Sequence, residues 1–171
     1  MGVLYLIPTP LGDYAPELVL PSSVLGIINE LDYLIVEQLR TARRLLSKIK
    51  INKPIDQIQF FELNKHTART EALSYLQVIY EGHSVGLLSE AGSPCVADPG
   101  AIIVKAAHEA GIKVVPLTGP SSIIMALMAS GFNGQSFSFH GYLPIPSDER
   151  NKTLKTLEKV ANQTGSTQIF I

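Results

Sequence analysis

Short runs of β-branched and aromatic apolar residues recur along the chain, and segments with apolar residues three or four positions apart lie between them. Such runs are typical of buried strands, and the second spacing is typical of amphipathic helices. Strands are predicted at 3–7, 33–36, 58–61, 85–88, 114–117 and 137–139, and helices at 21–30, 41–49, 67–80, 101–110, 121–129 and 148–161. This alternation predicts βαβ units and a mostly parallel sheet, and therefore an α/β fold.

The last residues, 167–171, form a further apolar run, which predicts another buried strand. No turn, cap or polar tail follows this run. We therefore expect a C-terminal portion to be missing from the chain.

Composition narrows the class of protein. The apolar share of 46% and the charged share of 17% are those of an ordinary globular protein. A net charge of -1 offers no general attraction for nucleic acid or an anionic membrane, so RNA binding would need a local basic cluster. The single cysteine, Cys95, excludes an intramolecular disulfide, and no apolar stretch approaches the roughly 20 residues of a membrane span. We expect a cytoplasmic protein without membrane attachment.

Glycine, proline and polar residues concentrate in the segments that follow the predicted strands. These segments are 8–12, 37–40, 62–66, 89–100, 118–122 and 140–146. In an open parallel sheet the loops after the strands meet at one edge, where ligands bind. We therefore expect the functional residues in these loops.

Segment 89–100 has the most specific pattern, because two glycines, two prolines and two acids precede a predicted helix. Glycine allows the backbone to approach a ligand, and the small Ser93 beside Gly92 leaves room for a flat or extended molecule. The carboxylates of Glu90 and Asp98 can accept hydrogen bonds from ribose hydroxyls or an ammonium group. The alternative is a tight turn that caps the helix and binds nothing.

Two other loops also have features of a binding site. Residues 118–122 end a strand and open a helix, whose free N–H groups could meet a carboxylate or phosphate. Plain N-capping by Ser121 or Ser122 is the alternative. Residues 8–12 follow the first strand, where a dinucleotide-binding protein would show G-x-G-x-x-G. That glycine pattern is absent, which argues against a dinucleotide-dependent oxidoreductase.

Together these loops resemble the tetrapyrrole methylase superfamily, and in particular its branch that methylates ribose in small-subunit ribosomal RNA. The start of that branch, L-Y-L-V-A-T-P-I-G, is similar to residues 4–12. Its S-D-A-G-T-P loop with a later D-P-G is similar to residues 89–94 and 98–100. Its G-P-S and G-F-L-P elements correspond to residues 119–121 and 141–144. The four elements occur in the same order, and this order makes the resemblance specific.

The resemblance implies a two-domain α/β enzyme with mostly parallel sheets, usually a homodimer, that binds S-adenosyl-L-methionine in a cleft between its domains. The first domain would span 1–117 and the second, incomplete here, would span 118–171. The expected partner is ribosomal RNA or the small ribosomal subunit. By position in the loops, the residues that would line the cofactor site are Pro10, Leu11, Gly92, Ser93, Val96, Ser121 and Ser122.

Glu37, Arg40 and Glu90 are the expected catalytic residues near the methyl acceptor. The branch normally carries E-D-T-R-H-T after its second strand, whereas this chain reads E-Q-L-R-T-A from residue 37. Gln38 and Thr41 therefore replace the branch's acid and histidine. Two alternatives stay open: a superfamily methyltransferase that acts on a tetrapyrrole or a protein side chain, and a catalytically impaired protein that only binds the cofactor.

The chain has one dense basic run, composed of Arg40, Arg43, Arg44, Lys48, Lys50 and Lys53. Arg40, Arg44 and Lys48 are four residues apart, so they share one helical face that could contact RNA phosphates. An ordinary solvated helix face is the alternative, because no aromatic residues for base stacking interleave with the basic ones.

The histidines show no spacing typical of metal ligands, so we expect no metal site. His66 and His140 are better placed for the predicted cleft than His83 and His108. Cys95 is expected to pack against its neighbours rather than act as a nucleophile, because no basic partner is close in sequence.

Overall fold

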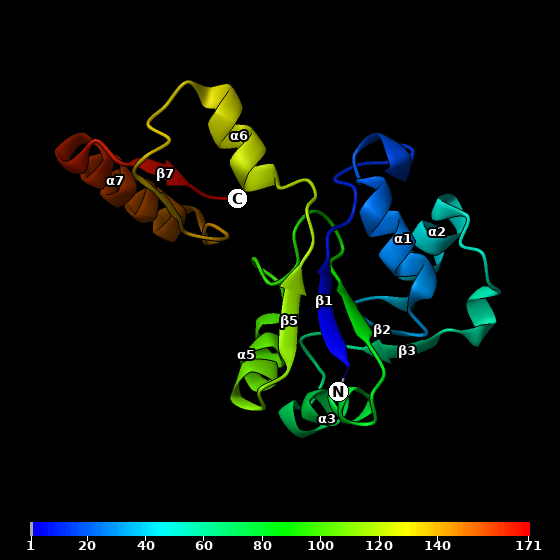
Figure 1. Cartoon of the computed structure of the whole chain (residues 1–171). Coiled ribbons are helices and arrows are strands. Elements are labelled where there is room, and N and C mark those ends of the chain that lie inside the picture. Colours follow the sequence, from blue (N-terminus) through cyan, green and yellow to red (C-terminus); the bar gives the residue numbers. More distant parts are fainter. Residues whose placement is uncertain (1) are drawn as a thin grey trace. The chain divides into compact units, whose positions relative to one another are not determined.

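The computed structural model describes residues 2–171 and contains a five-stranded and a two-stranded sheet (Figure 1). The strands of the larger sheet are β1 (Val3–Ile7), β2 (Tyr33–Val36), β3 (Gln59–Glu62), β4 (Val85–Leu88) and β5 (Lys113–Pro116). They lie in the order β3-β2-β4-β1-β5, and every neighbouring pair is parallel. The predicted α/β class and parallel sheet are confirmed.

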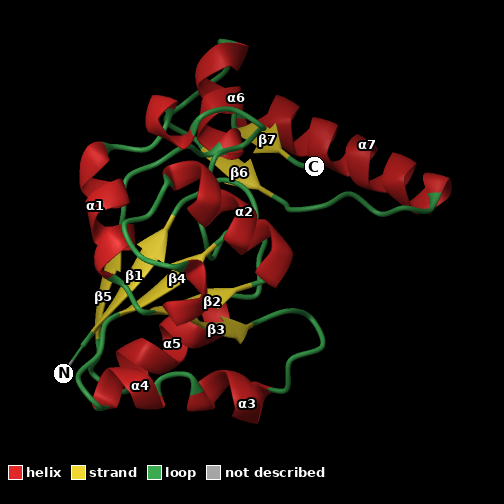
Figure 2. Cartoon of the chain, turned by 90° about the vertical axis from the view of Figure 1, so that its right-hand side faces the viewer, coloured by secondary structure: helices red, strands yellow, loops and turns green. Residues whose placement is uncertain are grey.

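Helices cover both faces of the larger sheet (Figures 1 and 2). They are α1 (Ser22–Glu30), α2 (Leu39–Ile49), α3 (Arg69–Ser74), α4 (Gln77–Tyr80) and α5 (Ala101–Glu109), with short 3-10 helices at Pro16–Leu18 and Ile55–Gln57. Apolar residues of α1 and α2 pack in one core cluster, and those of α3, α4 and α5 pack in the other. The sheet is therefore the middle of three layers.

The central strands β2 and β4 are almost wholly apolar because both of their faces are buried. In β4 the side chains of Val85 and Leu87 belong to one core cluster, whereas Leu88 belongs to the other. In β2, Ile35 belongs to the same core cluster as Val85 and Leu87, whereas Leu34 belongs to the same cluster as Leu88. Since side chains alternate along a strand, one apolar run supplies two cores.

The chain connections create a switch point at the carboxyl edge of the larger sheet. β4 lies between β1 and β2, which lead into α1 and α2 on one face, whereas β4 leads into α5 on the other. The register pairs Ile7 with Leu88, and Ile35 with Leu87, so the loops after these three strands begin at the same level. A ligand crevice is expected where adjacent strands send their connections to opposite faces.

The prediction of one continuous helix over 67–80 is wrong, because the structure has two helices there, α3 and α4. Between them the N–H of Leu76 bonds to the carbonyl of Leu73, a tighter spacing than that of an α-helix. The altered winding buries the adjacent Tyr75 and Leu76 together, with exposed fractions of 6% and 4%. Packing of these two side chains overrides the local helical pattern.

The chain divides into two units, Met1–Pro120 and Ser121–Ile171, and this division falls close to the expected boundary after residue 117. The second unit contains α6 (Ser122–Ser130), β6 (Phe137–Phe139), α7 (Ser147–Thr164) and β7 (Thr167–Ile169). β6 and β7 are parallel and α7 connects them, so this unit contains a βαβ motif.

The prediction that residues 167–171 form a buried strand is wrong in its burial. A strand forms as β7, but its side chains are only half-buried, and Phe170 and Ile171 are exposed. Within residues 121–171, all of which the structure describes, Leu157 is the only buried residue. Two strands and two helices provide too few layers to enclose a larger core.

In the described part of the chain, no helix combines the length and the hydrophobicity that crossing a membrane requires.

Candidate functional site

The loops after β1 and β4 are joined to each other at the switch point. The backbones of Thr9 and Gly92 exchange two hydrogen bonds, each 3.0 Å long. The Ser89 hydroxyl donates to the Gly92 carbonyl at 2.5 Å and lies 3.3 Å from the Thr9 hydroxyl. All three residues are buried. The two loops therefore form one connected surface at the carboxyl edge.

The carboxylate of Asp98 organises the rest of the loop after β4. It accepts the backbone N–H of Cys95 at 2.8 Å and that of Gly100 at 2.7 Å. Cys95 and Ala97 have φ values of 67° and 59°, in the left-handed region that L-residues rarely adopt. Gly92, with a φ of 76°, meets the same requirement without a side chain. Asp98 thus helps to hold an intrinsically unfavourable backbone in place.

The carboxylate of Glu37 is subject to the charges of two others at this edge, Glu90 and Asp98. Burial raises the pKa of Glu37, and the charges of Glu90 and Asp98 raise it further. Burial also raises the pKa of Asp98, against the opposing effect of its two N–H donors. Among residues 2–171 no ion pair involves any of the three. A positively charged ligand would relieve this repulsion.

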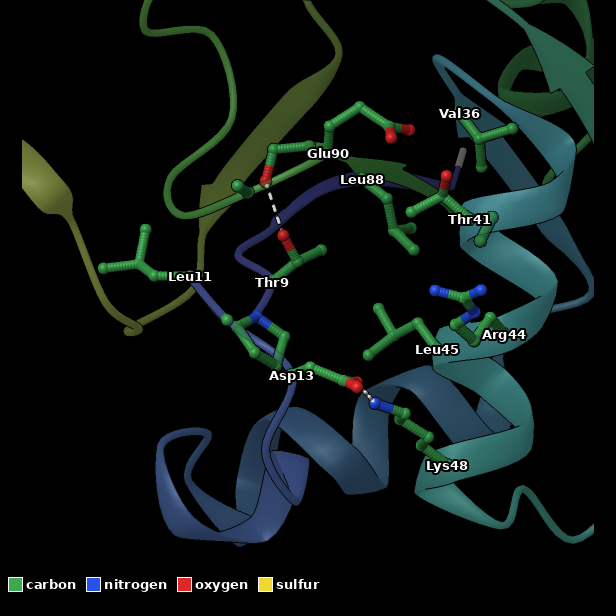
Figure 3. A pocket seen from close by; sticks show the side chains of 15 residues that line it. Thr9, Leu11, Asp13, Val36, Thr41, Arg44, Leu45, Lys48, Leu88 and Glu90 are labelled. Carbon is green, nitrogen blue, oxygen red and sulfur yellow. Dashed lines mark hydrogen bonds and ion pairs between the residues drawn. The ribbon is translucent and has the colours of Figure 1, made fainter.

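A pocket of about 320 Å³ lies beside these loops (Figure 3). Its walls are residues 9–13 after β1, residues 88–91 at the end of β4, Val36 of β2, and Thr41, Ala42, Arg44, Leu45 and Lys48 of α2. All of these residues belong to the first unit. The volume is at the lower end of the range for small-molecule sites.

The pocket is polar at its two ends and apolar between them. Figure 3 shows Glu90 and Thr41 at one end and an ion pair of Asp13 with Lys48 at the other. Leu45 and Leu88 form part of the apolar wall. A ligand with a charged end, an apolar middle and a hydroxyl-bearing end would match this arrangement.

Part of the predicted site is brought together here. Pro10, Leu11 and Glu90 line the pocket. Glu37 instead borders a separate, narrow cavity of about 10 Å³, together with Asp98. Arg40 is exposed in the first turn of α2 and is not among the residues that line the pocket.

The remaining predicted cofactor residues have different surroundings. The Ser93 hydroxyl donates to the carbonyl of Pro120 at 3.3 Å, and the Val96 side chain is 46% exposed. Ser121 is the N-cap of α6, and its hydroxyl accepts the N–H of Ile124 at 3.5 Å. Ser122 begins that helix. N-capping, the structural alternative for this segment, therefore occurs, and contact with a cofactor stays a prediction.

The basic run is divided among several partners. The Arg43 guanidinium lies 5.5 Å from the centre of the Phe60 ring, and Lys53 pairs with Asp32 at 2.5 Å. Lys48 pairs with Asp13, whose pKa is lowered first by this hydrogen bond and then by the Lys48 and Arg44 charges. Arg43, Lys48 and Lys53 therefore have specific partners, and contact of the Arg40, Arg44 and Lys48 face with RNA stays a prediction.

Sequence reasoning missed Asp13 and Ser89 as site residues. The Asp13–Lys48 contact joins positions 35 residues apart, and no local pattern indicates it. Ser89 could have been recognised as the first residue of the glycine-rich loop, but its burial and its bond to Gly92 depend on strand order.

The histidines lie apart from this pocket. His66 is exposed, and its N–H bonds to Asn64, whereas His140 bonds to Gln168 at 2.7 Å in the second unit. No group of three or more His, Cys, Asp or Glu side chains in residues 2–171 has the arrangement of a metal site.

Comparison with known proteins decides the family, because the model of the tetrapyrrole (corrin/porphyrin) methylases matches residues 3–170. The chain belongs to this family. It is similar to ribosomal RNA small subunit methyltransferase I of Vibrio cholerae (35% identical over 159 residues), Escherichia coli O157:H7 (36% over 157) and Bacillus subtilis (33% over 159). The matches cover 92–93% of the chain and 52% of each relative. The chain thus spans about half the length of the curated relatives it matches.

Two solved structures have the same fold as this tetrapyrrole methylase chain. The methyltransferase CobJ has a TM-score of 0.66 at 17% identity, covering 99% of this chain and 67% of its own. Uroporphyrin-III-C-methyltransferase from Thermus thermophilus has a TM-score of 0.57 at 22% identity, covering 85% and 64%. The resemblance expected from the four sequence elements is therefore confirmed for both family and fold.

Proposed function

We propose that the protein containing this chain transfers a methyl group from S-adenosyl-L-methionine to a ribose 2′-hydroxyl of small-subunit ribosomal RNA. The main support is the similarity to three proteins named ribosomal RNA small subunit methyltransferase I, at 33–36% identity over 92–93% of the chain. A tetrapyrrole acceptor has weaker support, because the uroporphyrin methyltransferase is only 22% identical and indicates the fold alone.

The residues of the first unit fit the proposed cofactor electrostatically. S-adenosyl-L-methionine carries a sulfonium cation, an ammonium group, a carboxylate and two ribose hydroxyls, and when bound it supplies an electrophilic methyl group. The unneutralised cluster of Glu37, Glu90 and Asp98 would attract those cations and accept hydrogen bonds from the hydroxyls. We infer that the cofactor is held by Pro10, Leu11, Gly92, Ser93, Val96, Ser121 and Ser122.

Glu90 is the proposed acceptor-side group, because it lines the pocket and belongs to the carboxylate cluster. A 2′-hydroxyl is a weak nucleophile, so a carboxylate that accepts its proton would assist the transfer. Glu37 would keep a negative charge beside Glu90, and its raised pKa makes it a stronger base than an ordinary carboxylate. Arg40 would contact the RNA from outside the pocket, at the first turn of α2.

The same proposal includes a cytoplasmic location, because the substrate would be the small ribosomal subunit or its RNA. It also includes a homodimer. Size-exclusion chromatography with light scattering of the natural protein tests the homodimer separately. A measured mass of one subunit would contradict the homodimer.

The decisive experiment is methyl transfer by the longest natural protein that contains this chain. Tritium from labelled S-adenosyl-L-methionine should pass to small subunits or their RNA from a strain that lacks the gene. A 2′-O-methylated nucleotide resists alkaline cleavage at its phosphodiester, so the label should survive hydrolysis in a dinucleotide. Label in protein or a tetrapyrrole, with none in RNA, would overturn the proposal.

Substitution of Glu90 tests its role within this proposal. Glu90→Gln should lower kcat by about 10²-fold or more, the usual contribution of a positioned proton acceptor. Its matched control is Glu17→Gln, at an exposed acid outside the pocket, which should leave kcat unchanged. Equal rates for both variants would remove Glu90 from the reaction.

A further inference from the structure

The end of the pocket formed by Asp13, Arg44 and Lys48 contains none of the residues that we propose to hold the cofactor. Arg44 and Lys48 lie one helical turn apart on α2, and both line the pocket. Lys48 pairs with the 84%-exposed carboxylate of Asp13. Arg44 forms no ion pair with any described residue, although its charge helps to lower the pKa of Asp13. Two cations and one carboxylate leave this end with a net positive charge.

The direction of Arg44 matters as much as its charge. In Figure 3 its guanidinium points from α2 toward the pocket, between Glu90 at one end and the Asp13–Lys48 pair at the other. A guanidinium forms paired hydrogen bonds to a phosphate, a geometry that an ammonium group cannot reproduce. Arg44 is therefore the available anion-binding group, whereas Lys48 already has a partner.

The remaining walls fit a sugar and a base. Leu45 and Leu88 provide an apolar surface, and the Glu90 carboxylate and the Thr41 hydroxyl can bond to sugar hydroxyls. The volume of about 320 Å³ suits one nucleotide and is too small for paired strands. A nucleotide within RNA would therefore have to leave its stack to enter, as it does in other enzymes that modify nucleotides.

We propose that this pocket binds a single unstacked nucleotide of the RNA, with Arg44 holding its phosphate and Asp13 competing with that phosphate for Lys48. The proposal rests on the proposed function, because it names how that substrate is held. In the free protein Asp13 keeps the Lys48 side chain at the pocket. When the nucleotide enters, its phosphate takes the place of the Asp13 carboxylate at Lys48.

Exchange of this kind is favourable because the Asp13–Lys48 pair is exposed to solvent, where ion pairs contribute little stability. A phosphate that reaches both Arg44 and Lys48 gains paired, charge-assisted bonds. This arrangement predicts a ranking of the effects of three substitutions on nucleotide binding. Loss of Arg44 should weaken nucleotide binding most, loss of Lys48 should weaken it less, and loss of the Asp13 charge should strengthen it.

The test is a titration of the natural protein with each of the four ribonucleoside 5′-monophosphates, in which NMR or calorimetry measures the binding affinity. The probes for comparison are the matching nucleosides and inorganic phosphate. At least one monophosphate should bind tenfold or more tightly than its nucleoside and than inorganic phosphate. Equal binding of nucleoside and monophosphate would exclude a phosphate anchor, and equal binding of inorganic phosphate would leave only a nonspecific anion site.

Variants at the surface of the pocket then test the roles of the residues. Arg44→Met should reduce the monophosphate affinity at least tenfold, Arg44→Lys should have an intermediate effect, and Asp13→Asn should raise the affinity threefold or more. Arg43→Met is the matched control, because Arg43 is adjacent in sequence but lies over Phe60 and does not line the pocket. An unchanged or weaker affinity in Asp13→Asn would overturn the competition.

Failure of this inference is distinguishable from failure of the proposed function. Transfer of label to RNA that is unaffected by Arg44→Met would leave the function standing and remove the nucleotide site. Arg44-dependent binding of monophosphates without transfer to RNA would support the site and reject the function.

Discussion

Thr9 and Gly92 exchange two backbone hydrogen bonds of 3.0 Å, although they belong to loops that follow different strands of the sheet. These bonds join the two loops where the connections of adjacent strands leave toward opposite faces. The pairing makes Gly92 a structural residue as well as a proposed cofactor residue. Substitutions at this position therefore affect folding and binding together.

We predict that Gly92→Ala destabilises the protein by about 1–2 kcal/mol, the usual cost of placing an L-residue in the left-handed region. The φ of Gly92 is 76°, and a β-branched residue such as valine should cost more. The control is Gly26→Ala within α1, where an added Cβ would meet nothing within 4 Å. It should stabilise the helix by about 1 kcal/mol. Urea unfolding measures the stability of both variants. Equal stabilities of Gly92→Ala and Gly26→Ala would contradict the role of the backbone conformation at Gly92.

The carboxylate cluster predicts that Glu37→Gln changes the stability of the folded protein in a pH-dependent way. The pKa of Glu37 is raised above its ordinary value of 4.5 by burial and then by the Glu90 and Asp98 charges. Ionisation of such a group is less favourable in the folded state, so it lowers stability as the pH rises from 4.5 through the raised pKa. Glu37→Gln should therefore be more stable than the parent protein at pH 7.

This advantage should disappear as the pH falls below 4.5, because Glu37 is then protonated in both folded and unfolded chains. Urea midpoints between pH 3 and pH 8 would measure it, with Glu17→Gln as the exposed control. A stability difference that does not change with pH would contradict the explanation.

Cys95 should react slowly with alkylating reagents in the folded protein. Burial, and then the Asp98 charge, raise the pKa of its thiol from 9.0 to about 12. Only the thiolate reacts, so alkylation by iodoacetamide at pH 8 should be roughly a hundredfold or more slower than in guanidinium. Mass spectrometry follows the reaction without ambiguity because the chain has one cysteine. Equal rates in native and unfolded protein would show that the thiol is not shielded.

Much of the local structure could be predicted from the sequence. The alternation of apolar runs and helical spacing located all seven strands of the described residues to within a few positions, because these periodicities report which faces are buried. The same reading placed Glu90, Pro10 and Leu11 in loops after strands, and the structure brings these three to one pocket. Their contacts with a cofactor or an acceptor stay predictions.

The predictions failed where packing between distant elements decides the outcome. The helix expected over 67–80 is interrupted because Tyr75 and Leu76 are both buried, and the last strand is only half-buried because few layers surround it. Neither result is contained in a local pattern. In each case the number and position of neighbouring elements determine how much of a side chain is covered.

By itself the sequence determined the α/β class, the succession of strands along the chain and the family, because these depend on local periodicity and on short motifs in a fixed order. Only the tertiary structure decided that β4 lies between β1 and β2, with its connection on the opposite face. That strand order pairs Thr9 with Gly92 and gathers the carboxylates of Glu37, Glu90 and Asp98. Charges separated along the chain interact only after the crossover connections bring their loops to one edge.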